Sequence, residues 1–373
     1  MFKKREIITF ALFAFGACGI HAQQQTVTDN RGKTMQVYIP QAEEKDYEIE
    51  VEYSNTKFYK QQNNGYGSHN GAETEDEAAT ISHLLSRASG AMQLTYHPEV
   101  QKYIDRYIKQ GRRSTSCLLA RADYYNPIFE EALRHYGLPL ELKNLPVIES
   151  GLNPKAISGK GAAGLWQLMP ATGKQYNLKI NNYVDERLDP IKSSYAAAKL
   201  LGDLYQRFGD WTLALAAYNC GPTRVSVAIE KAGGASDFWQ IYEYLPKETR
   251  GYVPAFIAAN FVMNYHADYN IMPESTGLPE QIGKVVVTED IPLAKIANLV
   301  DMDLADLKTL NPQYRQGIVK TIDGSATILL PAEKVKRFTD NAISLTQNNE
   351  IKDKQPTDIA AKIVGKQQHR TNS

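Results

Sequence analysis

The chain of 373 residues contains little cysteine, tryptophan or histidine, with three, three and seven copies. Cys18 lies in an apolar N-terminal stretch, so only Cys117 and Cys220 remain in the body of the chain. Two cysteines roughly a hundred positions apart, with scattered histidines, do not form a metal-binding pattern. A disulfide between Cys117 and Cys220 and a pair of buried free thiols are therefore both open alternatives.

An excess of charge of one sign is also missing, because 42 basic residues balance 42 acidic ones. This balance argues against a nucleic acid partner and against broad attraction to acidic lipid. A polymeric ligand would then be recognised by hydrogen bonds and stacking, for which the 22 tyrosines are suited. Hydrophobic residues make up 43% of the chain, which is enough for a real core.

Long apolar runs are absent as well, except for a short one in "MFKKREIITFALFAFGACGIHAQ". Its basic start, short apolar run and small residues predict a secretory signal peptide over residues 1–22, cleaved after Ala22. The run is too short for a membrane-spanning helix. A lipid anchor on Cys18 is the alternative, although Phe15 stands where a small aliphatic residue is usual. We therefore expect an exported protein.

The composition and the residue pattern change several times along the rest of the chain. Residues 23–75 are polar and predict a flexible lead-in without a core. Residues 76–119 predict a helical extension, and residues 120–270 predict helix after helix, broken at Gly and Pro. Residues 282–332 predict a strand, two helices and a strand, and residues 340–373 a disordered tail. The expected fold is mainly α, with a small βααβ module.

One glutamate in the helical region occupies a position that helical periodicity assigns to an apolar residue. In "LPLELKNLPVIESGLNP", a helix beginning near Pro139 places five residues on one face: Leu138, Leu142, Leu145, Glu149 and Leu152. Burial raises the pKa of a carboxyl group, and an acid still protonated near neutral pH suits general acid catalysis. The structural alternative is a glutamate that turns to solvent or pairs with a cation.

The stretch "SGKGAAGLWQLMP" that follows is rich in small residues, which let another group approach the backbone closely. A groove for a bulky ligand would fit there. We expect Trp166 to join the core and Gln167 to find a backbone or substrate partner. Further on, "ALAAYNCGPTRV" ends an alanine-rich helix with Tyr218 and Asn219, a weak signal by itself.

Together the motifs are specific. The ordered series ES, S, GLWQLMP, AYN and LPKETRGYVP resembles the lytic murein transglycosylases, which have a goose-type-lysozyme-like fold. More narrowly, the chain is similar to the membrane-bound type D enzymes, which carry C-terminal LysM repeats. The resemblance is strong over roughly residues 100–268. It implies that residues 120–270 form a lysozyme-like catalytic domain and that residues 282–332 form a LysM-like module.

The resemblance also implies a role for each matching position. Glu149 corresponds to the single catalytic acid and base, and the tyrosine of AYN is expected to point toward it. The substrate-binding positions that it implies are Ser158, Gln167, Met169, Tyr218, Asn219 and Tyr252. The stretch "VDERLDP" is interpreted as structural, an ion-paired turn ahead of the next helix.

The activity implied is cleavage of the β-1,4 bond between N-acetylmuramic acid and N-acetylglucosamine in peptidoglycan, with formation of a 1,6-anhydro ring. Neither a metal nor another cofactor is expected. The implied partner is the glycan strand, and the implied location is the periplasm, with attachment to the outer membrane as an option. No oligomeric state is indicated.

Three alternatives stay open. A muramidase on the same fold would use water and a second acid, for which Asp185 and Glu186 are the candidates. A non-catalytic peptidoglycan-binding scaffold is the second alternative. The third concerns the C-terminal module, in which "TEDIP" replaces the usual Gly-Asp-Thr. The module either binds glycan or only packs on the catalytic domain.

Overall fold

The computed structural model describes residues 24–28, 34–38, 75–234, 237–274 and 282–340. The expected signal peptide and nearly all of the expected C-terminal tail lie outside these residues. Within the polar lead-in, β1 (Gln24–Thr28) and β2 (Thr34–Tyr38) form an antiparallel pair that the sequence analysis did not anticipate.

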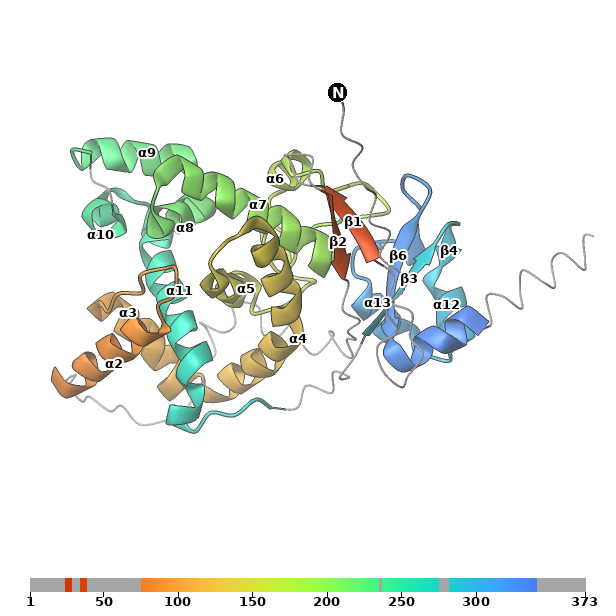
Figure 1. The fold of residues 1–373 in the computed structure, drawn as a ribbon, viewed down its shortest axis with the longest axis horizontal. Helices are drawn as coiled ribbons and strands as arrows, with labels where there is room; N and C mark the ends of the chain where they lie inside the picture. Colours follow the sequence, from red (N-terminus) through yellow and green to blue (C-terminus); the bar gives the residue numbers. More distant parts are fainter. Residues whose placement is uncertain (1–23, 29–33, 39–74, 235–236, 275–281, 341–373) are drawn as a thin grey trace, which may run out of the picture.

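The helical part follows from residue 75 to residue 269 (Figure 1). Its α-helices are α2 (Glu75–Ala88), α3 (Pro98–Asp105), α4 (Arg112–Tyr136), α5 (Leu145–Ser150), α6 (Pro170–Gln175), α7 (Pro190–Phe208), α8 (Trp211–Cys220), α9 (Pro222–Lys231), α10 (Phe238–Ile241) and α11 (Lys247–Tyr265). The short 3-10 or π-helical turns are η3 (Arg106–Gln110), η4 (Leu140–Asn144), η5 (Tyr242–Tyr244) and η6 (His266–Tyr269).

Helix α11 is the central helix of this part. It packs against α2, α3, α5 and α8, and it runs between α2 and α3 on one side and α4 and α5 on the other (Figure 1). Every residue from Tyr252 to Val262 is buried, as expected for a helix that is apolar on all sides. The buried polar residue Asn260 is satisfied by Asn144, whose Nδ2 donates to its Oδ1 at 2.8 Å.

Trp166 belongs to the core, as predicted. Its side chain is fully buried, and its ring packs edge-to-face on Phe129 with 5.1 Å between centroids. Its Nε1 donates to Ser194 Oγ at 2.8 Å, which satisfies the one polar atom of the indole. The tryptophan therefore fixes the turn that carries it against α4 and α7.

The C-terminal module, residues 282–340, has the expected βααβ order. Strand β3 (Ile282–Val287) pairs antiparallel with β6 (Ala326–Pro331), and the shorter β4 (Ile291–Pro292) and β5 (Ile318–Val319) pair with each other. Helices α12 (Leu293–Val300) and α13 (Leu304–Leu310) lie between them in sequence. The expected fold class, mainly α with a small βααβ module, is confirmed.

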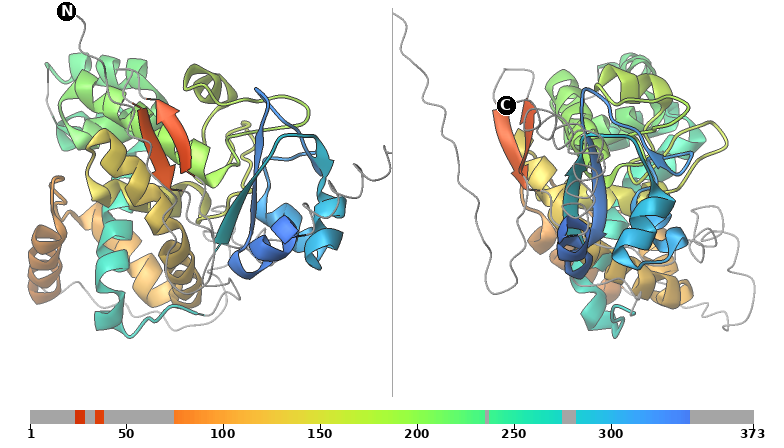
Figure 2. Two further views of the ribbon diagram at one scale, coloured as in Figure 1. Left: turned by 45° about the vertical axis from the view of Figure 1, so that its right-hand side comes forward. Right: turned by 90° about the vertical axis from the view of Figure 1, so that its right-hand side faces the viewer.

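The module continues beyond residue 332, where the sequence analysis placed its end. A further helix covers residues 332–340, and its Val335 and Phe338 join the hydrophobic core of the module. The periodicity of this short helix was hidden by the polar tail that follows it. The left view in Figure 2 shows the module beside the helical part.

The two parts share their cores. Val184, from the loop before α7, is buried in the core of the module, where it forms a β-bridge with Tyr314. In the reverse direction, Leu310 and Leu329 of the module belong to the core of the helical part. The module is therefore docked through apolar contacts on both sides.

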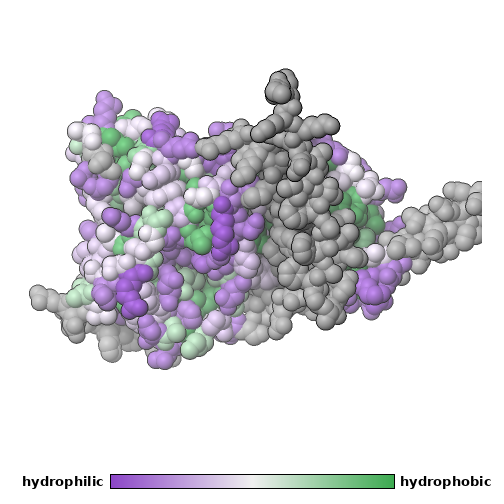
Figure 3. Space-filling view, in the orientation of Figure 1, coloured by the Kyte–Doolittle hydropathy of each residue, from purple (hydrophilic) through white to green (hydrophobic). Residues whose placement is uncertain are grey.

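The described surface is mostly polar. On the face shown in Figure 3, hydrophobic residues of the helical part are scattered among hydrophilic ones. Among the described residues, no helix has both the length and the hydropathy required to cross a membrane. Cys117 and Cys220 are both half-buried free thiols, so the structure takes the second of the two alternatives left open for them.

The helix over residues 332–340 gives a test of the module's boundary. Phe338→Ala removes a nearly fully buried ring, and we expect it to lower the free energy of unfolding of the module by about 3 kcal/mol. The control is Val286→Ala on β3, which is 36% exposed and should cost less than about 1 kcal/mol. Denaturant unfolding of both variants measures the difference; equal losses would mean that the helix is not part of the module.

Candidate active site

A groove of about 900 Å³ opens in the helical part, within the size range of ligand sites. It contains all seven residues that the sequence motifs assigned to a site: Glu149, Ser158, Gln167, Met169, Tyr218, Asn219 and Tyr252. They come from α5, from the loop after it, from the end of α8 and from α11. The structure thus brings together side chains that lie up to a hundred positions apart in sequence.

Glu149 lies in the last turn of α5, a helix of only six residues. The longer helix expected from residue 138 to residue 152 is wrong: η4 precedes α5, and Gly151 in the left-handed conformation ends it. Leu142, Leu145 and Leu152 are nevertheless fully buried, so the apolar spacing was meaningful even though one straight helix does not carry it.

Two hydrogen bonds anchor the C-terminal end of α5. Arg121 of α4 is buried and donates from Nη1 to the carbonyl oxygen of Gly151 at 2.9 Å. Ser150 Oγ donates to the carbonyl oxygen of Leu165 at 2.9 Å. Both hydrogen bonds fix the backbone beside Glu149, so the carboxylate is presented from a rigid support.

The environment of Glu149 favours its protonated form. The side chain is half-buried, and burial raises its pKa to about 7. The hydroxyl of Tyr252 donates to Glu149 Oε1, which opposes this rise, while the negative charge of Glu248 adds to it. Burial also raises the pKa of Tyr252, so the tyrosine remains a donor. The carboxyl group is therefore poised to give and take a proton near neutral pH.

The AYN residues support the groove through other contacts. The hydroxyl of Tyr218 donates to the carbonyl oxygen of Trp166 at 2.6 Å. Asn219 Oδ1 accepts a hydrogen bond from Thr249 Oγ1 at 2.9 Å, which links the end of α8 to α11. The tyrosine that hydrogen-bonds Glu149 is thus Tyr252, while the hydroxyl of Tyr218 is bound to backbone.

The groove loop, residues 151–169, is held by its own backbone and side chains. Ser158 Oγ accepts from the amide of Ala162 at 3.0 Å. Gln167 has a φ of 46° and donates from Nε2 to the carbonyl oxygens of Ala156 and Gly164 at 3.1 and 2.9 Å. Gln167 thus has the backbone partner that one of the two expectations foresaw. Met169 remains 42% exposed at the edge of the groove.

One of the glycines of this loop is required by packing. A Cβ on Gly164, whose φ is +81°, would lie 1.9 Å from the carbonyl oxygen of Arg187. No side chain fits there, so this glycine is required by the neighbouring "VDERLDP" segment. By contrast, a Cβ on Gly159 or Gly161 would meet nothing within 4 Å.

The "VDERLDP" segment has the structural role expected of it. Asp185 and Arg187 form a buried ion pair with 2.7 Å between Oδ2 and Nη2. Asp189 caps α7 by accepting from the amides of Ile191 and Lys192. Asp185 and Glu186, the candidates for a second acid, do not line the groove.

Other residues of the groove were missed. Glu248, at the start of α11, lines the groove. Its Oε2 lies 3.6 Å from Nζ of Lys160, and both side chains are well exposed. Tyr103 reaches the groove from α3 because Gly251 has no side chain: a Cβ there would lie 2.2 Å from its hydroxyl. The sequence singles out neither position. Glu248 resembles any acidic residue at the start of a helix, and Tyr103 lies in the predicted helical extension, where a tyrosine is a common packing residue. Within the described ranges, no group of three or more His, Cys, Asp or Glu is placed to hold a metal.

Two substitutions should move the pKa of Glu149 in opposite directions. Tyr252→Phe removes the hydrogen bond to the ionised carboxylate, so the pKa rises above about 7. Glu248→Gln removes a neighbouring negative charge, so the pKa falls. The measurement is a titration of the side-chain carboxyl carbon by ¹³C NMR, with Glu243→Gln, an exposed change outside the groove, as the control. Shifts of the same sign in both variants would contradict this account.

Comparison with known proteins gives matches to two domain families. Residues 126–241 match the transglycosylase SLT domain family, and residues 281–347 match the LysM-like domain of lytic transglycosylase MltD. Membrane-bound lytic murein transglycosylase D of Escherichia coli (strain K12) is 33% identical over 228 residues, which are 60% of this chain and 50% of the relative. The chain therefore spans half the length of that relative.

Two further similarities are shorter or more distant. Soluble lytic murein transglycosylase of Escherichia coli (strain K12) is 35% identical over 123 residues, 31% of this chain and 19% of the relative. The crystal structure of the 70 kDa soluble lytic transglycosylase from Escherichia coli aligns with a TM-score of 0.36 and 24% identity, covering 60% of this chain and 34% of that one. The two family matches, to a transglycosylase SLT domain and to an MltD-type LysM-like domain, agree with the resemblance that the motifs indicated.

Proposed function

We propose that the protein is an exported lytic transglycosylase that cleaves peptidoglycan glycan strands, with Glu149 as its acid and base. The observation that carries this proposal is the half-buried carboxyl group of Glu149, with a pKa of about 7 and one tyrosine donor, inside a large groove. The transglycosylase SLT domain and the murein transglycosylases among its relatives support the substrate class.

The first half of the reaction uses the protonated acid. Glu149 donates its proton to the glycosidic oxygen between N-acetylmuramic acid and N-acetylglucosamine, and the bond from C1 to that oxygen breaks. Positive charge develops at C1 of the muramic acid, where the N-acetyl group of the same sugar can stabilise it. A pKa of about 7 keeps a large share of the enzyme protonated for this step at neutral pH.

The second half uses the same group as a base. Glu149, now ionised, accepts the proton of the sugar's 6-hydroxyl, and that oxygen bonds to C1 to close the 1,6-anhydro ring. The hydroxyl of Tyr252 donates to the carboxylate and stabilises its ionised form between the two steps. The proton is returned to Glu149, and no water is consumed.

Hydrolysis on the same fold remains the second candidate, because Glu248 is a second carboxylate in the groove. A hydrolase needs such a group to activate water. Glu248 is well exposed and lies beside Lys160, so it has no dry position comparable to that of Glu149. A scaffold without activity is the third candidate, but such a protein has no use for a half-buried acid.

Export and attachment to a membrane also belong to the proposal. The N-terminal signal pattern supports export, and the name of the type D relative describes that protein as membrane-bound. The LysM-like domain supports binding of the glycan strand outside the catalytic groove. Peptidoglycan strands in the periplasm are therefore the proposed partner.

The product distinguishes the candidates. Residues 23–373 are incubated with purified peptidoglycan sacculi, and the released fragments are weighed by mass spectrometry. We expect sugar ends that are lighter by one water molecule than hydrolysed ends, because the 6-hydroxyl replaces water. Ends at the hydrolysed mass that disappear in Glu248→Gln would establish the muramidase instead.

The acid itself is tested by Glu149→Gln, which keeps the shape of the side chain and removes its proton. We expect release of fragments to fall by about 10³-fold, with binding to sacculi largely retained. The control Glu243→Gln, exposed and outside the groove, should release fragments normally. Turnover of the native enzyme should decline as the pH rises above about 7, since the ionised carboxylate cannot protonate the leaving oxygen. Unchanged release by Glu149→Gln would refute the assignment.

A further inference from the structure

The groove loop is held in place by a side chain from outside it. Arg187 donates from Nη1 to the carbonyl oxygens of Gly161 and Leu168 at 2.7 and 3.0 Å. Gly161 belongs to the turn closed by Ser158 and Ala162, and Leu168 ends the next turn, which is closed by Ala163 and carries Gln167. Because one guanidinium nitrogen binds both turns, the position of Arg187 sets the position of the loop.

Arg187 is itself held by Asp185. Its Nε and Nη2 donate to the two carboxylate oxygens at 2.9 and 2.7 Å, a bidentate pair that fixes the plane of the guanidinium. Asp185 is completely buried, and Arg187 is nearly so. A buried carboxylate requires full compensation, so any change in its partners is transmitted to Arg187.

The second side chain that binds Asp185 comes from the LysM-like module. Arg315 donates from Nη2 to Asp185 Oδ2 at 2.8 Å. The backbones of the two segments are also paired, since the amide of Asp185 donates to the carbonyl oxygen of Gln313 and the amide of Arg315 donates to that of Tyr183. A second contact reaches the groove loop directly: Lys155 Nζ donates to Thr309 Oγ1 of α13 at 2.7 Å.

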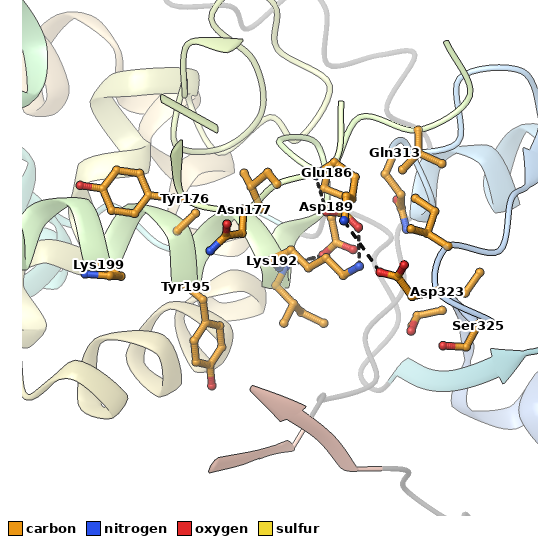
Figure 4. A pocket seen from close by; sticks show the side chains of 18 of the residues that line it. Tyr176, Asn177, Glu186, Asp189, Lys192, Tyr195, Lys199, Gln313, Asp323 and Ser325 are labelled. Carbon is orange, nitrogen blue, oxygen red and sulfur yellow. Dashed lines mark hydrogen bonds and ion pairs between the residues drawn. The ribbon is translucent and has the colours of Figure 1, made fainter. Parts of the chain in front are cut away.

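Another part of this interface contains a cavity. A cavity of about 530 Å³ lies between α7 and the module, with Lys192 and Glu186 on one side and Asp323 and Ser325 on the other (Figure 4). Two other polar contacts cross this interface away from the groove loop: Gln316 Nε2 donates to the carbonyl oxygen of Asn182 at 3.1 Å, and Lys179 lies 3.8 Å from Asp323.

We propose that the LysM-like module braces the catalytic groove: Arg315, acting through Asp185 and Arg187, is a positioning residue for the loop that carries Ser158 and Gln167. The module then contributes to turnover whether or not it binds glycan. This inference rests on the proposed function for its effect on catalysis, but the brace itself is a property of the fold. Reacting groups tolerate little displacement, so a loosened turn lowers the rate of the chemical step more than it weakens binding.

The test is Arg315→Met in the full chain. We expect the turnover number on soluble glycan strands to fall about tenfold, with KM within about twofold of the native value. Arg315→Lys should restore most of the rate, because Arg315 reaches Asp185 through a single nitrogen. The matched control is Arg337→Met, an exposed arginine of the same module that pairs with Asp301 and should leave turnover unchanged.

Hydrogen exchange separates the brace from the activity. In Arg315→Met, the amides of Ala163 and Leu168, which bond across the turn, should exchange about tenfold faster. Amides of the β3–β6 pair should keep their protection, which would show that the module is folded. Thr309→Val, which removes the acceptor of Lys155, is the second variant and should also speed exchange in the groove loop.

Each result decides a separate question. Unchanged exchange at Ala163 and Leu168 in both variants would overturn the brace, whatever the activity. Faster exchange together with an unaltered turnover number would overturn its catalytic importance. Native protein without any glycan cleavage, but with faster loop exchange in the variants, would refute the proposed function and leave the brace standing.

Discussion

The central constraint in this protein is the placement of one carboxyl group, Glu149, where water reaches it only partly. Burial raises its pKa to about 7, and a single tyrosine hydroxyl limits that rise. Much of the surrounding structure maintains this balance. Helix α5 is kept short by Gly151 and anchored by Arg121, while the buried helix α11 supplies Tyr252. An acid with more donors would stay ionised, and one with none would hold its proton too firmly to act as a base.

A second buried carboxylate shows the opposite solution. Asp185 is more deeply buried than Glu149, yet two guanidinium groups and several hydrogen bonds compensate its charge. It joins three segments of the chain: the groove loop through Arg187, the turn before α7 to which it belongs, and the LysM-like module through Arg315. The two carboxyl groups thus differ in their partners, which are one tyrosine hydroxyl for Glu149 and two guanidinium groups for Asp185.

The residues proposed for the site lie in short, specific segments of the sequence. Glu149 stood out by its place in an apolar pattern, and all seven expected residues line one groove. The prediction that small residues let another group approach the backbone holds at Gly164, where that group is the backbone of Arg187. Local sequence shows that a residue is small, but not which neighbour requires it.

The sequence by itself determined the mainly helical fold and the βααβ module and singled out Glu149 as the proposed acid, because periodicity and ordered motifs are local properties of the chain. Only the tertiary structure decided which tyrosine hydrogen-bonds Glu149, that Glu248 and Tyr103 share its groove, and that Arg315 reaches Asp185. These pairs lie far apart in sequence, so no spacing rule relates them. They exist because packing of α3, α11 and the module brings the side chains together. Burial then strengthens the electrostatic interactions between them, because the protein interior screens charge less than water does.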